Sequence, residues 1–174
     1  SQIEAKPINW LWPGRIAKGK VSMIVGNPGL GKSQVCASLA SVVSNGGMWP
    51  VDRVRAAAGS VVILSAEDDP EDTIRPRLEA AEADLDRIFI LDAIRTERDG
   101  AEAKRGFDLT MDIARLGALL HELGDAALVI IDPITAYLGD ADSHKNAEVR
   151  ALLAPLAEMA AAQRVAVIAV SPLT

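Results

Sequence analysis

A glycine-rich turn near the start of the chain has the residue types that bind phosphate. In IVGNPGLGKSQ, Gly26 is followed after four residues by Gly31-Lys32-Ser33, with an apolar run before the turn and a helix-like pattern after it. This is the G-x-x-x-x-G-K-[ST] pattern, in which backbone N–H groups surround phosphate oxygens, the lysine reaches the β- and γ-phosphates and the hydroxyl serves Mg²⁺. We therefore predict a nucleotide site at this turn. Its candidate binding residues are Gly26, Asn27, Pro28, Gly29, Leu30, Gly31, Lys32, Ser33 and Gln34.

A single aspartate follows another apolar run. In LVIIDPIT, Asp132 comes directly after four apolar residues. A carboxylate at the end of a buried strand fits a direct or outer-sphere partner of Mg²⁺, whereas an aspartate that caps the next turn is the structural alternative. Because the phosphate motif lies upstream, we favour the metal role. Ser33 and Asp132 are thus the predicted magnesium residues.

Carboxylates are concentrated in VVILSAEDDPED, after a second apolar run. A carboxylate near the γ-phosphate can orient or deprotonate the attacking water. Asp69 before Pro70 fits a helix cap, and Glu71 and Asp72 fit acids of the first helical turn. Glu67 is our predicted catalytic base, with Asp68 as the second candidate and a solvated acidic turn as the alternative. Lys32 is the second predicted catalytic residue, because its ammonium group would neutralise developing charge.

The pattern of apolar residues predicts the elements that position these groups. Apolar runs without polar alternation are typical of buried parallel strands. They are Val21–Val25, Val61–Leu64, Ile88–Leu91, Leu128–Ile131 and Val165–Val170. Helical segments are predicted at Lys32–Ser44, Pro70–Ala83, Met111–Leu123 and Ala147–Ala162, and mobile loops at Thr96–Gly106 and Gly139–Asn146. Alternating strands and helices predict an α/β fold, a three-layer sandwich with a mainly parallel sheet and ligands at the carboxyl ends of the strands.

Length and composition indicate one globular domain. The chain has 174 residues, a net charge of −6 and one cysteine, so we expect no disulfide framework, no overall attraction for nucleic acid and a cytoplasmic location. No apolar run reaches the roughly 18 residues of a membrane span. Because Thr174 follows closely on an apolar run, we expect a single domain over residues 1–174 that is cut short at its C-terminal end.

Some conspicuous residues have structural interpretations. We predict that Trp10 and Trp12 plug the edge of the sheet as apolar anchors. Cys36, one turn into the first helix, is expected to be a small buried apolar residue. Arg75 and Arg77 are expected on a solvated helix face, where they would pair with neighbouring acids, and contact with nucleotide or a neighbouring subunit is the alternative. Those acids are Glu71, Asp72 and Glu79.

With these residues identified, the chain resembles the RecA-like P-loop ATPases, and among them the RepA-type hexameric replicative helicases of plasmids and phages. The matching stretches are WLWPGRIAKGKVSMIVGNPGLGKS, GSVVILSAEDDPEDTIRPRL, LVIIDPITAYLG and NAEVRALLAPLAEMAAAQRVAVIAV. The resemblance implies an ATP-dependent motor with sites between the subunits of a ring, with ATP and Mg²⁺ as cofactors and single-stranded DNA as a partner. It implies phosphate and Mg²⁺ binding by Lys32 and Ser33, catalysis by Glu67 and a Mg²⁺-linked Asp132.

The chain departs from that group after its last apolar run. There the group usually has a histidine-containing stretch followed by a lysine or arginine, whereas this chain reads Ser171-Pro172-Leu173-Thr174. We favour a Mg²⁺-dependent ATPase core that serves DNA replication or a mobile element. The departure motivates the alternative of a nucleotide-gated oligomeric scaffold with little hydrolysis. A small-molecule kinase is disfavoured, because the loop at Thr96–Gly106 is not the arginine-rich lid that such an enzyme needs.

Overall fold

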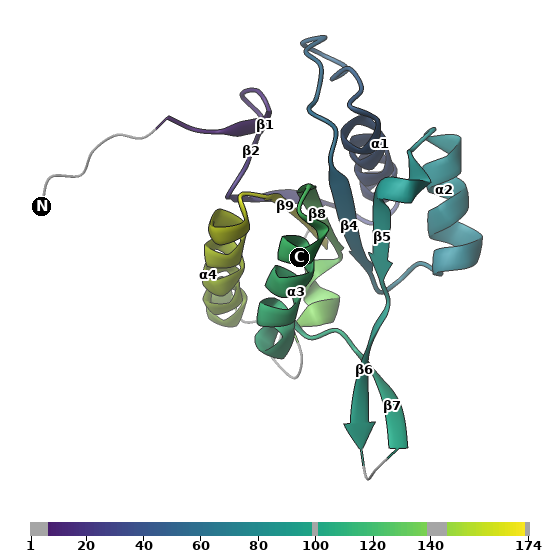
Figure 1. Ribbon diagram of the computed structural model, residues 1–174, viewed down its shortest axis with the longest axis vertical. Coiled ribbons are helices and arrows are strands. Elements are labelled where there is room, and N and C mark those ends of the chain that lie inside the picture. Colours follow the sequence, from purple (N-terminus) through teal and green to yellow (C-terminus); the bar gives the residue numbers. More distant parts are fainter. Residues whose placement is uncertain (1–6, 99–100, 139–145, 173–174) are drawn as a thin grey trace, which may run out of the picture.

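The computed structural model describes residues 7–98, 101–138 and 146–172, and its centre is a five-stranded parallel sheet in the order β3-β9-β8-β4-β5 (Figure 1). The five strands are β3 (Val21–Gly26), β9 (Ala166–Pro172), β8 (Ala126–Asp132), β4 (Ser60–Ser65) and β5 (Ile88–Leu91). They contain the five predicted runs, except that Val165 lies just before β9. β9, which comes last in sequence among the described strands, lies between β3 and β8.

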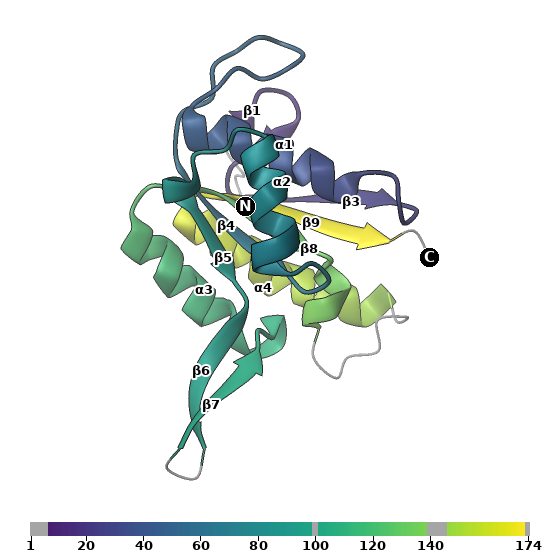
Figure 2. The ribbon, with the colours of Figure 1, turned by 90° about the vertical axis from the view of Figure 1, so that its right-hand side faces the viewer.

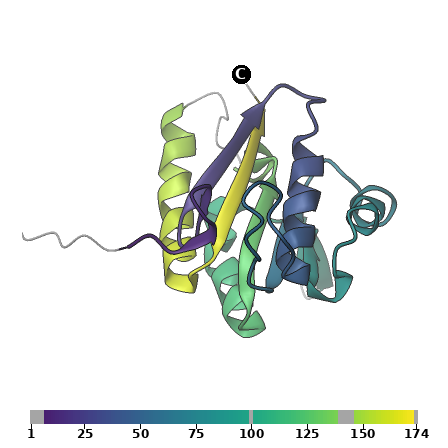
Figure 3. The same cartoon turned by 90° about the horizontal axis from the view of Figure 1, so that it is seen from above.

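Helices cover both faces of the sheet. Seen from above, α1 lies on one side of β3 and β9 and α4 on the other (Figure 3). The helices are α1 (Lys32–Asn45), α2 (Arg75–Ala80), α3 (Leu109–Leu123) and α4 (Asn146–Gln163). Alternate residues of the central strands pack to opposite faces, so that Ile130 joins the core under α1 while Ile131 joins the core under α3 and α4. This arrangement confirms the predicted three-layer α/β fold.

The predicted helix at Pro70–Ala83 is interrupted. A π-helical turn, η1 (Pro70–Ile74), leads into α2, which ends at Ala80, and a short 3-10 turn, η2 (Leu85–Arg87), precedes β5. Pro76 lies in the first turn of α2 and has no N–H to donate to the preceding turn. The wider turn closes instead through the Arg75 N–H, which donates to the carbonyl of Pro70. Asp69 caps this segment as predicted, accepting from the N–H groups of Glu71 and Asp72.

The prediction of a mobile loop at Thr96–Gly106 is wrong. The chain forms an antiparallel hairpin there, β6 (Ala93–Arg98) and β7 (Ala101–Gly106), which projects from the body of the molecule (Figure 2). The sequence between the strands is Asp99-Gly100, a dipeptide that favours the tight turns of two-residue hairpins. The charged composition of the segment concealed this pairing. Residues 139–145 of the second predicted loop lie outside the described residues.

Two of the tryptophans connect the N-terminal hairpin to the segment that follows α1. Trp12 of the hairpin β1 (Trp10–Trp12) and β2 (Ile16–Ala17) stacks on buried Trp49, with ring centroids 4.7 Å apart. The indole N–H of Trp12 donates to Asp52 at 2.9 Å. Trp12 packs against the hydrophobic core, whereas Trp10 is 38% exposed and is not the apolar anchor that the sequence predicts. The outer edge of β3 has no partner among the described strands.

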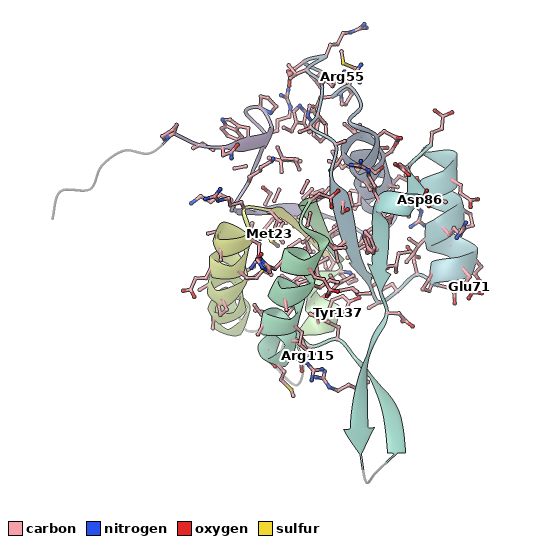
Figure 4. The ribbon with its side chains drawn as sticks, in the orientation of Figure 1. Met23, Arg55, Glu71, Asp86, Arg115 and Tyr137 are labelled. Carbon is pink, nitrogen blue, oxygen red and sulfur yellow. The ribbon has the colours of Figure 1, made fainter. Side chains whose placement is uncertain are left out.

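Side chains on β3 show the same exposed edge. Met23, near α4 in Figure 4, is 42% exposed, and Val25 is 51% exposed. Apolar residues of an internal strand would be covered on both faces.

Among the helices that the structure describes, none is long and apolar enough to cross a membrane.

Candidate functional site

The glycine turn opens directly onto the positive end of α1. Gly29 and Gly31 have φ values of 79° and 78°, a left-handed conformation that glycine adopts without the strain of a side chain. No side chain caps the first turn of α1, and that turn contains no acidic residue. Its backbone N–H groups and the helix dipole therefore remain available to an anion.

Lys32 folds back across the turn. Its Nζ donates to the carbonyls of Gly26 and Asn27, each at 2.8 Å. These contacts hold the ammonium group beside the loop that the sequence predicts to bind phosphate. A phosphate oxygen next to the turn would compete with neutral carbonyls for this cation, and an anionic acceptor makes the stronger hydrogen bond.

Ser33 and Asp132 meet although 99 positions separate them in the chain. The Ser33 hydroxyl donates to Oδ2 of Asp132 at 2.7 Å. Ser33 lies in the first turn of α1, and Asp132 is the last residue of β8. The two predicted magnesium residues are thus adjacent.

A cavity of about 400 Å³ brings the predicted residues together. We call it the phosphate-loop cavity; its lining includes Lys32, Ser33, Glu67, Arg77, Asp132 and Pro172. Pro28, Gly29, Gly31 and Gln34 also line it. The remaining candidate binding residues, Gly26, Asn27 and Leu30, do not. Gly26 and Asn27 contact Lys32 through their carbonyls, and the Leu30 side chain is 69% exposed.

Glu67 reaches the cavity because of the register of β4 and β8. Ser65 pairs with Asp132 at the ends of these neighbouring strands, so the chain two residues later lies at the same edge of the sheet. Glu67 is exposed and lines the phosphate-loop cavity. Glu71, by contrast, lies on the outer side of the η1–α2 segment (Figure 4). Its place fits the first-turn acid that the sequence predicts.

Arg77 lines the phosphate-loop cavity, although the sequence interpretation favoured a solvated helix face for it. Its guanidinium group donates to Asp68 at 2.6 Å, with 24% and 30% of the two side chains exposed. Contrary to the prediction, Arg77 does not pair with Glu71, Asp72 or Glu79. Arg75 does pair with Glu79, at 3.0 Å, as predicted. Helical periodicity could have separated the two arginines, because residues two positions apart point to different sides of a helix.

Cys36 lies on the inner side of this site. It is 5% exposed, as predicted. Burial, and secondarily the charge of Asp132, raises the pKa of the Cys36 thiol to about 12. The thiol is therefore protonated at neutral pH and acts as a packing group.

The donor set at Ser33 and Asp132 fits magnesium. Hydroxyl and carboxylate oxygens are hard ligands, and Mg²⁺ in nucleotide sites takes few protein ligands besides water and phosphate oxygens. Among the residues that the structure describes, no group of three or more histidine, cysteine, aspartate or glutamate side chains could hold a metal. A bound Mg²⁺ would thus rely on Ser33, Asp132, water and the nucleotide.

A parallel sheet whose glycine turn opens onto a helix, with lysine, serine and a strand-end aspartate in one cavity, defines a P-loop nucleotide-binding ATPase fold. The model of a protein family described as the AAA domain matches residues 1–171. The chain therefore belongs to the AAA domain family. A search of curated proteins finds no match. Family membership supports nucleotide binding and ATPase activity as the general class of function.

Proposed function

We propose that the chain binds Mg²⁺-ATP in the phosphate-loop cavity and hydrolyses it, with Glu67 orienting the attacking water. One observation carries this proposal: Lys32, Ser33, Glu67 and Asp132 come from three separate segments and line the same cavity. A phosphate turn that served only to bind an anion would not require carboxylates in the same cavity.

Each residue has a distinct role in this proposal. The loop amides and Lys32 bind the β- and γ-phosphates and neutralise charge that develops on them. Ser33 and Asp132 hold Mg²⁺, which when bound supplies further positive charge against the phosphate oxygens. Glu67 accepts a hydrogen bond from a water molecule and orients it towards the γ-phosphate. The exposed position of Glu67 leaves this water accessible.

Two substitutions test these roles separately. Lys32→Ala should abolish nucleotide binding, and Glu67→Gln should leave binding intact but stop turnover. Isothermal titration calorimetry with Mg²⁺-ATP measures the first effect and steady-state phosphate release the second. Glu71→Gln is the matched control, because it removes the same charge from outside the cavity. Parental turnover by Glu67→Gln would refute the assignment of the base, and parental affinity in Lys32→Ala would refute the site.

We also propose that this ATPase works in a ring of copies and serves DNA replication or a mobile element. The resemblance to RepA-type helicases supports this finer function, and Glu67 is exposed at the phosphate-loop cavity, as a site shared between subunits requires. Single-stranded DNA should then stimulate ATP turnover, and the stimulation should depend on protein concentration. Turnover that responds to neither would contradict the helicase proposal while leaving the ATPase proposal intact.

A nucleotide-gated scaffold is the second candidate, and Pro172 favours it. This proline lines the phosphate-loop cavity at the end of β9, where its side chain offers no polar contact to the nucleotide. In this case Mg²⁺-ATP would bind and promote assembly with little hydrolysis. Sedimentation with ATP and with a non-hydrolysable analogue should give the same assembly. Assembly that requires turnover would contradict the scaffold.

A further inference from the structure

A second cavity lies at the opposite end of the sheet from the phosphate loop. It measures about 410 Å³, and we call it the basic cavity. Its lining is Pro7, Ile8, Asn9, Lys18, Gly19, Lys20, Ala161 and Arg164. Lys20 directly precedes β3, whereas the phosphate loop follows the end of that strand. A strand of this length places the two sites about 20 Å apart.

The basic cavity concentrates positive charge in a chain of net charge −6. Its lining has three cations, Lys18, Lys20 and Arg164, and no carboxylate. None of the three forms an ion pair with another residue in the described part of the chain. Lys20 and Arg164 are exposed and Lys18 is half-buried.

The negative C-terminal end of α4 offsets only part of this positive charge. Arg164 follows α4 directly, and cations favour the negative end of a helix. That end is equivalent to about half a negative charge, which three cations exceed several-fold. The cavity therefore retains a net positive potential.

Backbone contacts hold the three cations close together. Gly19, with φ +72°, donates its N–H to the carbonyl of Val165 at 2.7 Å. A Cβ at Gly19 would lie 3.4 Å from the Cα of Ala161, so a larger residue would press against α4. The N–H of Lys18 donates to the carbonyl of Asn9 at 2.8 Å, and that of Val167 donates to the carbonyl of Lys20 at 3.0 Å. The site is thus built from the two turns that precede neighbouring strands.

We infer that the basic cavity binds a phosphate-bearing ligand, through charge-assisted hydrogen bonds from Lys18, Lys20 and Arg164. A guanidinium can contact a phosphate in a bidentate manner, while lysines supply point charges. Pro7 and Ile8 give the cavity an apolar wall, and Ile8 is 57% exposed. The phosphate can come from a small polyphosphate in solution or from a nucleic acid strand. Binding of either ligand at the basic cavity does not require the phosphate-loop cavity.

The test uses Lys32→Ala chains, so that the phosphate loop does not contribute. Sodium tripolyphosphate is titrated calorimetrically, and a labelled single-stranded oligothymidylate is followed by fluorescence anisotropy. We expect binding of at least one probe, weakened about tenfold by Lys20→Glu and again by Arg164→Glu, as for lost charge-assisted contacts. Arg75→Glu, an equal charge change at an exposed arginine on α2, should leave binding unchanged.

The two probes distinguish the source of the phosphate. Tripolyphosphate binding alone would identify a small ligand, whereas tighter oligothymidylate binding, with a slope of log K against log salt of about −2, would identify a strand held by three contacts. Binding of neither probe would overturn the inference. Equal binding of poly-glutamate would also overturn it, because the site would then not select phosphate. None of these results depends on ATP binding or hydrolysis at the phosphate loop.

Discussion

Arg75 and Arg77 are two residues apart, yet their guanidinium groups have different surroundings. Arg75 contacts Glu79 on the solvent side of α2, where 63% and 53% of the two side chains are exposed. Arg77 contacts Asp68 at the wall of the phosphate-loop cavity, at a shorter distance and with less exposure. Water screens the first pair far more than the second. The two arginines therefore allow an internal comparison of ion pairs.

Arg77→Ala should destabilise the protein more than Arg75→Ala. We expect a loss of about 1 kcal/mol for Arg77→Ala, the upper end for partly exposed pairs. Arg75→Ala should cost about 0.3 kcal/mol, as for an exposed i,i+4 pair. Urea unfolding of the two single variants gives both values. Equal losses would show that the contact with Asp68 adds no stability beyond that of a surface pair.

At the scale of elements, a buried carboxylate connects the projecting hairpin to α3. Asp112 is 1% exposed and accepts two hydrogen bonds from Arg105 of β7, at 2.6 and 2.7 Å. The N–H of Asp108, which caps α3, donates to the same carboxylate at 2.9 Å. The hydrogen bonds from Arg105 lower the pKa of Asp112. A two-stranded hairpin is marginal by itself, so this contact supplies the attachment at its base.

Asp112→Asn should destabilise the protein in a pH-dependent way. Because the folded state lowers the pKa of Asp112, the ionised carboxylate stabilises the fold above the unfolded-state value, about pH 4. That contribution is lost as the pH falls through the lower folded-state pKa. We expect a deficit of about 2 kcal/mol at neutral pH, which diminishes below about pH 4. Urea unfolding across this range measures it.

Asp86→Asn is the control for this titration. Asp86 is exposed on η2 and its position is marked in Figure 4. Its substitution should change stability little at any pH. A deficit of Asp112→Asn that stayed constant down to low pH would show that packing, and not the charge of Asp112, makes the contribution.

At the scale of the whole molecule, the phosphate-loop cavity depends on the packed sheet. A ligand that binds only the folded chain stabilises it by mass action, by about 2.7 kcal/mol at 100 times its dissociation constant. For a chain of 174 residues, such stabilisation raises the melting temperature by roughly 5–10 °C. Binding at this site can therefore be measured without any turnover.

A non-hydrolysable ATP analogue with Mg²⁺ should raise the melting temperature of the parental chain and of Glu67→Gln alike. Lys32→Ala should show no shift, because it lacks the cation that binds the phosphates. Removing Mg²⁺ with EDTA should reduce the shift, as expected if Ser33 and Asp132 hold the metal. Differential scanning calorimetry gives the values. An equal shift in Lys32→Ala would place nucleotide binding outside the phosphate-loop cavity.

The strands of the central sheet and the starts of its helices were predictable because their causes are local. A fully covered parallel strand needs a continuous apolar run, as in Leu128–Ile131, and Asp69-Pro70 marks a helix start wherever it occurs. The glycine turn and Asp132 were recognisable for the same reason. The roles of Glu67, Lys32, Ser33 and Asp132 in binding and catalysis stay predictions, which the substitutions above test.

Several features that the sequence did not predict depend on how segments pack against one another. The position of β9 between β3 and β8 follows from no local pattern, and the basic cavity requires Lys20 and Arg164 to precede neighbouring strands. The contact of Arg77 with Asp68 depends on how α2 returns over the sheet. At β6–β7 the charged side chains do not give the apolar pattern of a strand, and the hairpin was therefore not predicted although its two strands are close in sequence. Local chemistry thus predicted the strands and helices around the central sheet, but neither their neighbours nor the β6–β7 hairpin.

The order of the strands has a consequence for biosynthesis. The ribosome synthesises β9 after Lys32, Ser33, Glu67 and Asp132. The sheet is complete only when β9 inserts between β3 and β8. A nascent chain whose β9 is still inside the ribosome therefore contains every predicted catalytic and metal-binding side chain. It does not yet have the complete sheet that brings them together. Competence for nucleotide should arise only after β9 has left the ribosome, in one step, when this strand enters the middle of the sheet.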